Sequence, residues 1–400
     1  MAEPKVRFKK DDGSSYPAWR TIPMSEVFTE ISEKNHPELP VLSVQQGVGT
    51  VLRDSSDRNI LYDKSNLKNY KAMKKDDYII HLRSFEGGLE CSNYDGISSP
   101  AYRILRSQAI LPAAYRDYFR SYEFIHNKLA VSVVGIRDGK NIDMDTFWQI
   151  PMSIPCIEEQ QKIADFLYFV DEVISTSEQE VANLETQKKA VMKKVFSQEV
   201  RFKRTDGTDF PEWGKQTLGN LAEFSKGQGY TKSDLSETGS PIILYGRLYT
   251  KYQTVISEVD TFAEMKPRSV LSKKGDVIVP ASGETAEDIS VAAVVDVDGI
   301  ILGGDLNIIH PCNAILPDYL AYALTFGTPH QEMAKRAQGK SIVHLHNDDL
   351  KSAVIVYPCI EEQRLIADFL SDFDEAIAAA KSELELWKEL KKGLLQQLFV

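Results

Sequence analysis

A long internal repeat constrains this chain more than any other feature of its sequence. Pro155–Leu167 and Pro358–Leu370 agree at eleven of thirteen positions, at an offset of 203 residues. A second pair of segments, Arg7–Trp19 and Arg201–Trp213, agrees at seven of thirteen positions without a gap. Two such matches in the same order indicate that a unit of about 200 residues is duplicated in tandem.

Each copy of the repeat divides into a short lead, a variable stretch and a long helix. The lead is basic and aromatic and ends in Pro-x-Trp. The variable stretches, residues 20–150 and 214–354, contain short β-branched and aromatic runs broken by Gly, Pro, Asn and Asp, which predict strands and loops. They share only a skeleton, seen where Asp77–Ile80 resembles Asp276–Val279. Similar connectors around divergent stretches predict one frame that holds two different readers.

The helices are predicted over residues 158–197 and 361–399. Apolar residues alternate there at spacings of four and three over about five heptads, which is typical of a coiled coil. Each heptad seam contains one lysine, Lys188 in the first helix and Lys391 in the second. Helices from the two halves of a duplication can pair antiparallel about a pseudo-twofold axis. We then expect each lysine to lie opposite an acidic residue of the other helix. The predicted partners are Asp368 or Asp372 for Lys188, and Asp165 or Asp171 for Lys391.

Both helices begin with an acidic pair after a proline, which suits the partial positive charge of a helix N-terminus. A pair of carboxylates can also act in acid–base catalysis, but no nucleophile lies near either pair in the sequence. We therefore assign this motif to the helical frame, where the family resemblance given below also implies partner binding. The residues concerned are Glu158, Glu159, Gln160, Glu361, Glu362 and Gln363.

These patterns predict an α/β (α+β) fold: two domains with substantial β content, separated by two long antiparallel coiled-coil helices, in a pseudo-twofold tandem repeat. The first variable domain with its lead would cover residues 1–154, and the first long helix residues 155–198. The second domain with its lead would cover residues 199–357, and the second long helix residues 358–400.

Composition excludes several classes of protein. No stretch approaches the roughly 18 apolar residues of a membrane span, and the N-terminal residues lack the apolar core of a signal peptide. The four cysteines are far apart and form no Cys-x-x-Cys pair, which fits a reducing cytoplasm. A net charge of −11 argues against a protein that coats nucleic acid non-specifically, although local basic patches remain compatible with it.

No pattern in the chain predicts catalytic, metal or cofactor chemistry. Gly339–Ser341 ends like a phosphate-binding loop, but Ala334 stands where the first glycine is required. Gly227 and Gly229 form a flexible loop rather than a dinucleotide fingerprint. His344 and His346 alternate as on a strand, so both rings would project from one face. They favour a surface or DNA-facing pair over a metal site, because no matching carboxylate or thiolate cluster accompanies them.

Basic residues interleaved with aromatic and small polar groups mark the candidate DNA-binding positions, although a mixed solvated surface gives the same pattern. Arg247 lies between Tyr245 and Tyr249 in a run with strand-like alternation, so it is a candidate reader of guanine, or else an anchor for a local acidic neighbour. Lys251 is better suited to phosphate, and Glu284 can accept a hydrogen bond from cytosine N4. The full set is Arg53, Arg58, Lys64, Arg83, Ser84, Lys226, Tyr230, Lys232, Arg247, Tyr249, Lys251, Tyr252, Ser282, Glu284, His344 and His346.

The combination of features resembles the specificity subunit of Type I restriction–modification enzymes. The resemblance is carried by the doubled unit and by helices that open Pro-x-Ile-Glu-Glu-Gln and continue Ile-Ala-Asp-Phe-Leu. In the second variable stretch, KGQGYTKSDL, SGETAEDIS and LGGDLNII resemble a recurring class of target-recognition domain. The resemblance implies a protein that is not itself an enzyme. Each variable domain would read one half of a bipartite, asymmetric sequence in double-stranded DNA, and the helices would set the spacing. Two methylation subunits would bind the helical frame, and restriction subunits would join them.

Two alternatives come from other classes of protein. One is a coiled-coil adaptor that binds only proteins, and the other is a stand-alone nuclease, which lacks support because no acidic metal motif is present. A bipartite DNA methylation motif, mapped after co-expression with a methylation subunit, would separate DNA recognition from both.

Overall fold

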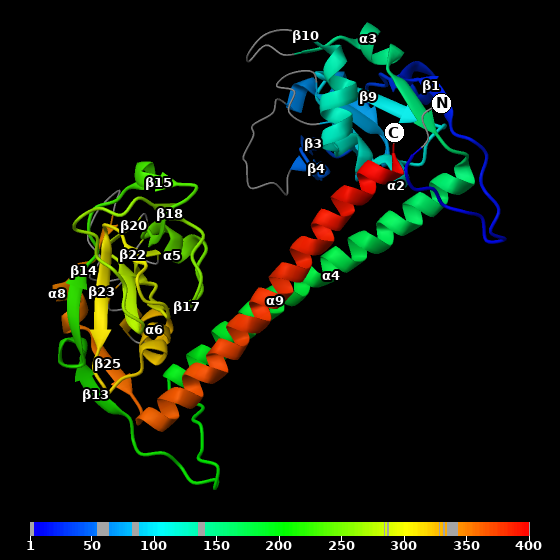
Figure 1. The fold of residues 1–400 in the computed structure, drawn as a ribbon. Helices are drawn as coiled ribbons and strands as arrows, with labels where there is room; N and C mark the ends of the chain where they lie inside the picture. Colours follow the sequence, from blue (N-terminus) through cyan, green and yellow to red (C-terminus); the bar gives the residue numbers. More distant parts are fainter. Residues whose placement is uncertain are drawn as a thin grey trace. The chain divides into compact units, whose positions relative to one another are not determined.

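The computed structural model describes residues 4–53, 64–81, 88–134, 141–283, 285, 288–327, 329–330, 333 and 343–399. Its contacts divide the chain into two compact units. Unit 1 comprises Met1–Glu178 and Glu383–Val400, and unit 2 comprises Gln179–Ser382. Each unit contains one variable domain together with part of both long helices (Figure 1).

The two predicted helices form as α4 (Ile157–Phe196) and α9 (Ile360–Leu398). The predicted seam of α4 consists of Ile163, Leu167, Val170, Ile174, Ser177, Val181, Leu184, Lys188, Val191 and Val195, and that of α9 of the residues 203 positions later. Every one of these positions is buried or half-buried, which confirms the seam. In both units the helices run antiparallel, because residue numbers rise along one helix as they fall along its neighbour. The ion pairs that show this are Asp171–Lys391 (2.5 Å) and Glu178–Lys388 (3.0 Å) in unit 1, and Glu185–Lys381 (2.7 Å) and Lys188–Asp374 in unit 2.

Unit 1 is built around a four-stranded antiparallel sheet with two-stranded ribbons beside it. The sheet order is β2 (Phe28–Ile31), β9 (Tyr102–Ser107), β6 (Tyr78–His81) and β7 (Glu90–Cys91). The ribbons pair β1 (Arg20–Pro23) with β12 (Pro151–Ile154), β3 (Leu42–Gln45) with β4 (Gly49–Leu52), β5 (Lys71–Met73) with β8 (Gly96–Ser98), and β10 (Val133–Val134) with β11 (Asn141–Ile142).

Short helical segments complete the domain of unit 1. They are α1 (Met24–Val27), α2 (Pro112–Tyr115) and α3 (Met144–Gln149), with the shorter turns η2 (Lys64–Asn69), η3 (Tyr118–Arg120), η4 (Phe124–Lys128) and η5 (Leu129–Ser132).

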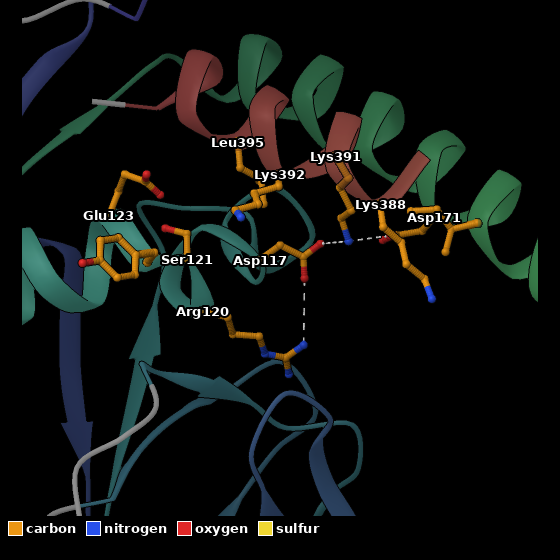
Figure 2. A pocket seen from close by; sticks show the side chains of 11 residues that line it. Asp117, Arg120, Ser121, Glu123, Asp171, Lys388, Lys391, Lys392 and Leu395 are labelled. Carbon is orange, nitrogen blue, oxygen red and sulfur yellow. Dashed lines mark hydrogen bonds and ion pairs between the residues drawn. The ribbon is translucent and has the colours of Figure 1, made fainter. Parts of the chain in front are cut away.

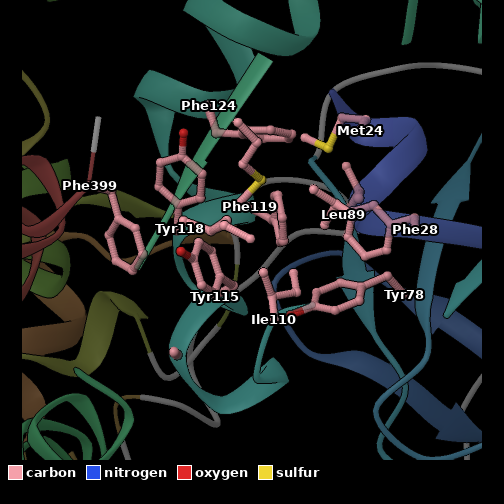
Figure 3. Packing of buried hydrophobic residues seen from close by; sticks show 14 of the residues in the cluster. Met24, Phe28, Tyr78, Leu89, Ile110, Tyr115, Tyr118, Phe119, Phe124 and Phe399 are labelled. Atoms are coloured by element: carbon pink, nitrogen blue, oxygen red, sulfur yellow. The ribbon is translucent and has the colours of Figure 1, made fainter. Parts of the chain in front are cut away.

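Aromatic side chains fill the core of unit 1, and the end of α9 contributes to it. The ring of Phe399 stacks on Tyr118 at 4.6 Å between centroids and meets Tyr115 edge-on at 5.1 Å. Figure 3 shows Phe399 beside these two tyrosines, with Phe119 and Phe28 deeper in the same cluster. The C-terminal end of α9 is therefore part of the hydrophobic core of the first domain.

Unit 2 contains a five-stranded and a four-stranded sheet. The first has the order β14 (Ala222–Lys226), β23 (Leu306–Pro311), β19 (Asp276–Pro280), β21 (Ala293–Val295) and β17 (Val255–Ile256). The second has the order β15 (Leu235–Ser236), β18 (Phe262–Ala263), β16 (Ser240–Ile243) and β22 (Ile301–Leu302). The pairs β17–β21 and β16–β22 are parallel, and the other pairs are antiparallel.

Two ribbons and several short helices accompany the sheets of unit 2. The ribbons pair β13 (Gly214–Thr217) with β25 (Val354–Tyr357), and β20 (Ser282–Gly283) with β24 (Val343–His344). The helices are α5 (Gly246–Thr250), α6 (Pro317–Phe326) and α8 (Asn347–Ser352), with the turns η7 (Leu218–Asn220), η8 (Lys232–Asp234) and η9 (Asp288–Ser290).

The skeleton that the sequence predicted for both domains is present. The order β2-β9-β6-β7 in unit 1 corresponds to β14-β23-β19-β21 in unit 2. Asp77 precedes β6 and accepts the N–H of Lys74 at 2.7 Å, and Asp276 opens β19 and accepts the N–H of Lys273 at 2.8 Å. The same aspartate therefore closes the same turn before each central strand. Mixed helices and strands with long paired helices confirm the predicted fold class.

Within the ranges described above, no helix has the length and apolar character needed to cross a membrane.

Candidate nucleic-acid interface and its helical frame

A buried glutamate joins each lead to the start of the long helix that follows its domain. In unit 1 the guanidinium of Arg7 donates to both carboxylate oxygens of Glu159, at 3.1 and 2.8 Å, and the indole of Trp19 donates to the same carboxylate at 3.2 Å. Unit 2 repeats this arrangement with Arg201, Glu362 and Trp213, at 3.2, 2.8 and 3.2 Å. Paired, fork-shaped contacts of this kind fix orientation as well as charge.

The glutamine that follows each glutamate joins the helix to the domain. The side chain of Gln160 accepts the N–H of Leu111 at 2.7 Å and donates to the carbonyls of Ala109 and Pro155. Gln363 makes the matching bonds to Leu316, Ala314 and Pro358. The leucine that donates to the glutamine is in both copies the N-cap of a helix, and a proline follows it as the first helical residue, in α2 of unit 1 and α6 of unit 2. The repeated motif is therefore an internal joint between domain and helix.

This geometry corrects one part of the prediction for the acidic motifs. Glu159, Gln160, Glu362 and Gln363 are at most 2% exposed, so they hold the frame from inside and offer no surface to a partner. Only Glu158 and Glu361 face solvent.

Each seam lysine contacts one or two carboxylates between the helices, and we call such a set of charged groups a polar layer. Lys391 contacts both Asp171 and Asp117, each at 2.5 Å, so the predicted pair with Asp171 is confirmed. Lys188 pairs with Asp374 rather than with Asp368 or Asp372, which is a correction. Asp368 and Asp372 are exposed, because the helices meet in a register further along α9 than their midpoints suggest, and this brings Asp374 to the seam.

A pocket of about 460 Å³ adjoins the Lys391 layer in unit 1. Figure 2 shows Asp117 between Arg120 and Lys391, with Asp171 on the far side of the lysine. Burial alone would raise the pKa of Asp117, but the charges of Lys391, Arg116 and Arg120 outweigh it and lower the pKa below its ordinary value of 3.8. The layer therefore keeps the carboxylate of Asp117 ionised although its side chain is only 14% exposed.

In unit 2, three of the candidate DNA contacts gather at the end of β14 away from the β13–β25 ribbon. Lys226 ends β14 opposite Asn307, whose amide donates to the carbonyl of Leu345 at 2.9 Å. His344 and His346 flank Leu345, and their rings stack at 6.2 Å with an interplanar angle of 7°. Lys226, His344 and His346 are all exposed. They form an exposed polar edge, as the alternation of the histidines predicted.

His346 also caps α8. The backbone N–H of Asp349 donates to the carbonyl of His346 at 3.0 Å, and the carboxylate of Asp349 accepts the N–H of His346 at 3.0 Å. The backbone of His346 is therefore fixed at the start of α8, while its side chain stays exposed.

The segment around Arg247 is a helix, α5, and the predicted strand-like alternation is wrong. At 3.6 residues per turn, Arg247 projects from the side of the helix opposite Tyr245 and Tyr249, so the three side chains do not share one face. Arg247 and Lys251 both bind Asp260, and hydrogen bonds from them lower its pKa to about 2. The structure thus agrees with the alternative prediction, in which Arg247 anchors a local acidic neighbour.

Two other candidates in unit 2 are buried, which corrects their placement on a DNA-facing surface. The ring of Tyr230 is 6% exposed, and its hydroxyl bonds Ser269 at 2.5 Å while Lys266 covers the ring at 4.4 Å. Ser282 is 5% exposed because β20 pairs with β24. Among the remaining candidates Lys232 is exposed, whereas Tyr249 and Tyr252 are half-buried. The guanidinium of Arg247 lies 5.7 Å from the ring of Tyr252.

The candidates of unit 1 fall mostly on parts of the chain that the structure leaves undescribed. Arg58, Arg83, Ser84 and, in unit 2, Glu284 lie outside the described residues, as does the side chain of Lys64. Arg53 is half-buried at the end of the β3–β4 hairpin and donates to the hydroxyl of Ser43 at 3.0 Å.

Sequence reasoning missed several polar contacts in both domains. In unit 1, Glu90 pairs with Arg120 at 2.6 Å although 30 positions separate them. In unit 2, Tyr322 donates to Asp374 at 2.7 Å. No local pattern signals either contact, because the partners come together only when the domain folds. No group of three His, Cys, Asp or Glu residues suited to a metal ion occurs in the described part of the chain.

Comparison with known proteins points to one family. Residues 211–386 match the model of the Type I restriction modification DNA specificity domain. Two curated relatives come from Methanocaldococcus jannaschii. The Type I restriction enzyme MjaVIII specificity subunit is 25% identical over 316 residues, which are 76% of this chain and 73% of that protein. The putative type I restriction enzyme MjaX specificity subunit is 25% identical over 267 residues, 64% of this chain and 60% of the relative.

Solved structures share the fold. A chain from a study of complex assembly and conformational transition in a type I R-M system has a TM-score of 0.58 at 18% identity, covering 96% of this chain and 98% of that one. The S subunit of a Type-I restriction-modification system from M. genitalium has a TM-score of 0.57 at 14% identity, covering 100% and 99%.

The matched specificity domain lies in the second half, and the similarity to the first relative extends over three quarters of the chain. The buried joint between lead, domain and helix occurs in both halves. This chain is therefore similar in sequence to specificity subunits of Type I restriction–modification systems, over the matched domain and over three quarters of its length.

Proposed function

We propose that this protein reads DNA for a Type I restriction–modification complex, and that each domain recognises one half of a bipartite, asymmetric target. The observation that carries the proposal is the contrast within the repeat. The joints at Glu159 and Glu362 make the same hydrogen bonds, whereas the sheets and ribbons of the two domains differ beyond their shared four strands. One repeated frame holding two different domains suits a protein that reads two unlike sequences at a fixed spacing.

The chemistry of methylation and cleavage would belong to partner subunits, and this chain would be non-catalytic. Two methylation subunits would dock on the helical frame, because a frame repeated in both halves offers two similar surfaces. Restriction subunits would join through that complex. The complex would work in the cytoplasm, where the four free cysteines of this chain remain reduced.

In the second domain, the polar edge of Lys226, His344 and His346 is the part best placed to meet DNA. A flexible ammonium such as that of Lys226 suits a phosphate, and an imidazole N–H such as that of His346 can donate to a base acceptor. Arg247 and Lys251 would reach DNA only by exchanging Asp260 for a phosphate or a base. Comparing Arg247→Ala with Lys251→Ala on matched and mismatched DNA tests this. Equal losses on both DNAs for Arg247→Ala would assign it to holding rather than reading.

The proposal is tested by co-expressing the chain with a Type I methylation subunit and mapping genome-wide DNA methylation. A bipartite motif is the expected result. Residues 214–354 are then exchanged for the matching domain of a relative. One half of the motif should change, while the other half and the spacing stay the same, because the frame holds each domain separately. A change in both halves would contradict a model of two independent readers.

A further inference from the structure

The β3–β4 hairpin of unit 1 presents an exposed turn on a tightly fixed backbone. Gln45, Gln46 and Val48 are exposed at its tip, with Val48 at 46%. Gly47 and Gly49 both have a positive φ, at 76° and 102°. A Cβ on Gly49 would lie 2.3 Å from the carbonyl oxygen of Cys91, so the base of the turn packs directly on β7.

The backbone of this turn is held by the buried side chain of Glu90 and the half-buried side chain of Asn93. The N–H of Gly47 donates to Glu90 at 2.8 Å. Asn93 donates to the carbonyls of Val48 and Thr50 at 2.9 and 3.0 Å. Both sides of the turn are thus bonded to the sheet, while the side chains at the tip face solvent.

Glu90 connects the turn to the helical frame through charged groups. It pairs with Arg120 at 2.6 Å, and Arg120 lies 3.9 Å from Asp117, which pairs with Lys391 on α9 (Figure 2). Every side chain in this series is at most 20% exposed. A chain of ion pairs therefore runs from the long helix to a surface turn.

Such a network is a poor way to gain stability alone, because removing charges from water costs free energy that their attraction only partly returns. What buried polar networks can provide is a single defined geometry. An ordinary solvent-exposed turn does not require a single defined geometry. A turn that reads bases requires it, because a displacement of about 1 Å weakens hydrogen bonds to a base edge.

We propose that the β3–β4 turn is a base-reading element of the first domain, and that Glu90 and Arg120 are its positioning residues. This inference rests on the proposed function. The side chains at the tip indicate the kind of base pair. A glutamine amide pairs with N6 and N7 of adenine in the major groove, and a valine methyl packs on the methyl group of thymine. The turn would read an A·T pair in the half-site of the first domain.

The first experiment replaces Gln45, Gln46 and Val48 together by alanine, in the complex with the methylation subunits. Methylation rates are measured on DNA substrates that vary each base of each half-site in turn. We expect a loss of about 10- to 100-fold in discrimination at an A·T pair of one half-site, with the other half-site unchanged. Gln216→Ala, an exposed glutamine on β13, is the matched control and should leave both half-sites unchanged.

The second experiment tests positioning with Glu90→Gln, whose amide oxygen can still accept the N–H of Gly47 but carries no charge for Arg120. Discrimination should fall several-fold at the same A·T pair, and restoring the glutamate should recover it. The other half-site serves as the internal reference, because a general loss of folding would lower both alike.

An unchanged motif for the triple variant would overturn the inference, as would equal losses at both half-sites. If the unaltered complex itself methylated no bipartite motif, the proposed function would fail instead, so the two failures are distinguishable.

Discussion

The two seam lysines occupy the same position in the repeat but have different surroundings. In unit 1, Lys391 lies between two carboxylates, those of Asp117 and Asp171. In unit 2, Lys188 has one carboxylate, Asp374, and lies 5.3 and 5.5 Å from the ring centroids of Tyr322 and Phe326. The helical frame is repeated, whereas each domain completes the layer with its own side chains.

The difference can be traced to the segment that begins with Leu-Pro in each copy. Asp117 is five residues after Pro112, and Tyr322 is five residues after Pro317. Nine residues after the same prolines stand Ser121 and Phe326. The small Ser121 lines the open pocket of unit 1, while Phe326 covers the lysine in unit 2. The same helical frame can therefore be combined with different domains, because each domain needs only to supply carboxylates or aromatic rings that stabilise the charge of the seam lysine.

The largest expected effect comes from the joint that the two units share. Glu159→Ala and Glu362→Ala each remove a buried carboxylate and leave a partly buried arginine without its counter-charge. Each should lower the free energy of unfolding by about 3–5 kcal/mol. Urea titration followed by tryptophan fluorescence measures this, since Trp19 and Trp213 contact the two glutamates. Clearly unequal losses would show that the joints are not equivalent.

The lysine layers should differ in the next experiment. Lys391→Met leaves Asp117 and Asp171 without the cation between them, and we expect a loss of about 2–4 kcal/mol at pH 7, discounted for partial exposure. Lys188→Met leaves one carboxylate that still accepts a hydrogen bond from Tyr322, and should cost about 1–2 kcal/mol. Parallel urea titrations compare the two variants, and a larger loss for Lys188→Met would reverse the proposed contrast.

The pH dependence of the Lys391 layer should change sign in the same variant. In the unaltered protein the folded-state pKa of Asp117 is lowered, so its contribution is present above its ordinary 3.8 and is lost as the pH falls through the folded value. In Lys391→Met, burial and the neighbouring carboxylate should raise that pKa, so stability should increase as the pH falls from 7. Unfolding measured from pH 7 to pH 3 would expose the opposite slopes. Parallel slopes would mean that Lys391 does not set this pKa.

A smaller effect is expected for Tyr322→Phe. Burial, followed by the charge of Asp374, raises the pKa of Tyr322, so its hydroxyl keeps the proton that it donates to Asp374. Loss of that bond should cost about 1–2 kcal/mol, because Lys188 still pairs with the carboxylate. Tyr168→Phe, an exposed tyrosine on α4, is the control and should be neutral. If Tyr322→Phe lowered the free energy of unfolding no more than this control, Lys188 alone would compensate the charge of Asp374.

The smallest effects should come from the exposed pairs between the helices. Lys381→Ala in unit 2 and Lys388→Ala in unit 1 remove pairs with Glu185 and Glu178 that stand largely in water. Solvent and salt screen such pairs, so both variants should unfold at the wild-type urea midpoint in 0.15 M salt. A marked shift of the urea midpoint in either variant would indicate that these exposed pairs, and not the lysine layers, fix the register of the helices.

Structural features that produce a regular pattern along the chain, such as the long helices, could be predicted from the sequence. The heptads placed α4 and α9 within one residue of their observed ends, and the repeat offset identified the paired lysines. The predictions failed where short segments depended on their surroundings. Tyr245–Tyr249 has an alternating pattern, but five residues are too few to decide between strand and helix, and packing made them a helix. Tyr230 carries a polar group, yet the fold buried its ring.

The sequence by itself determined the duplication, the paired helices and the family resemblance, because repeats and heptads are regular along the chain and need no knowledge of contacts. Only the tertiary structure decided which charges meet. Glu90 and Arg120, Lys391 and Asp117, and Arg7 and Glu159 lie 30, 274 and 152 positions apart. Ion pairs between residues so distant depend on how strands and helices are packed, and no spacing in the sequence encodes that packing. The joints of the frame and the support of the β3–β4 turn are therefore properties of the fold.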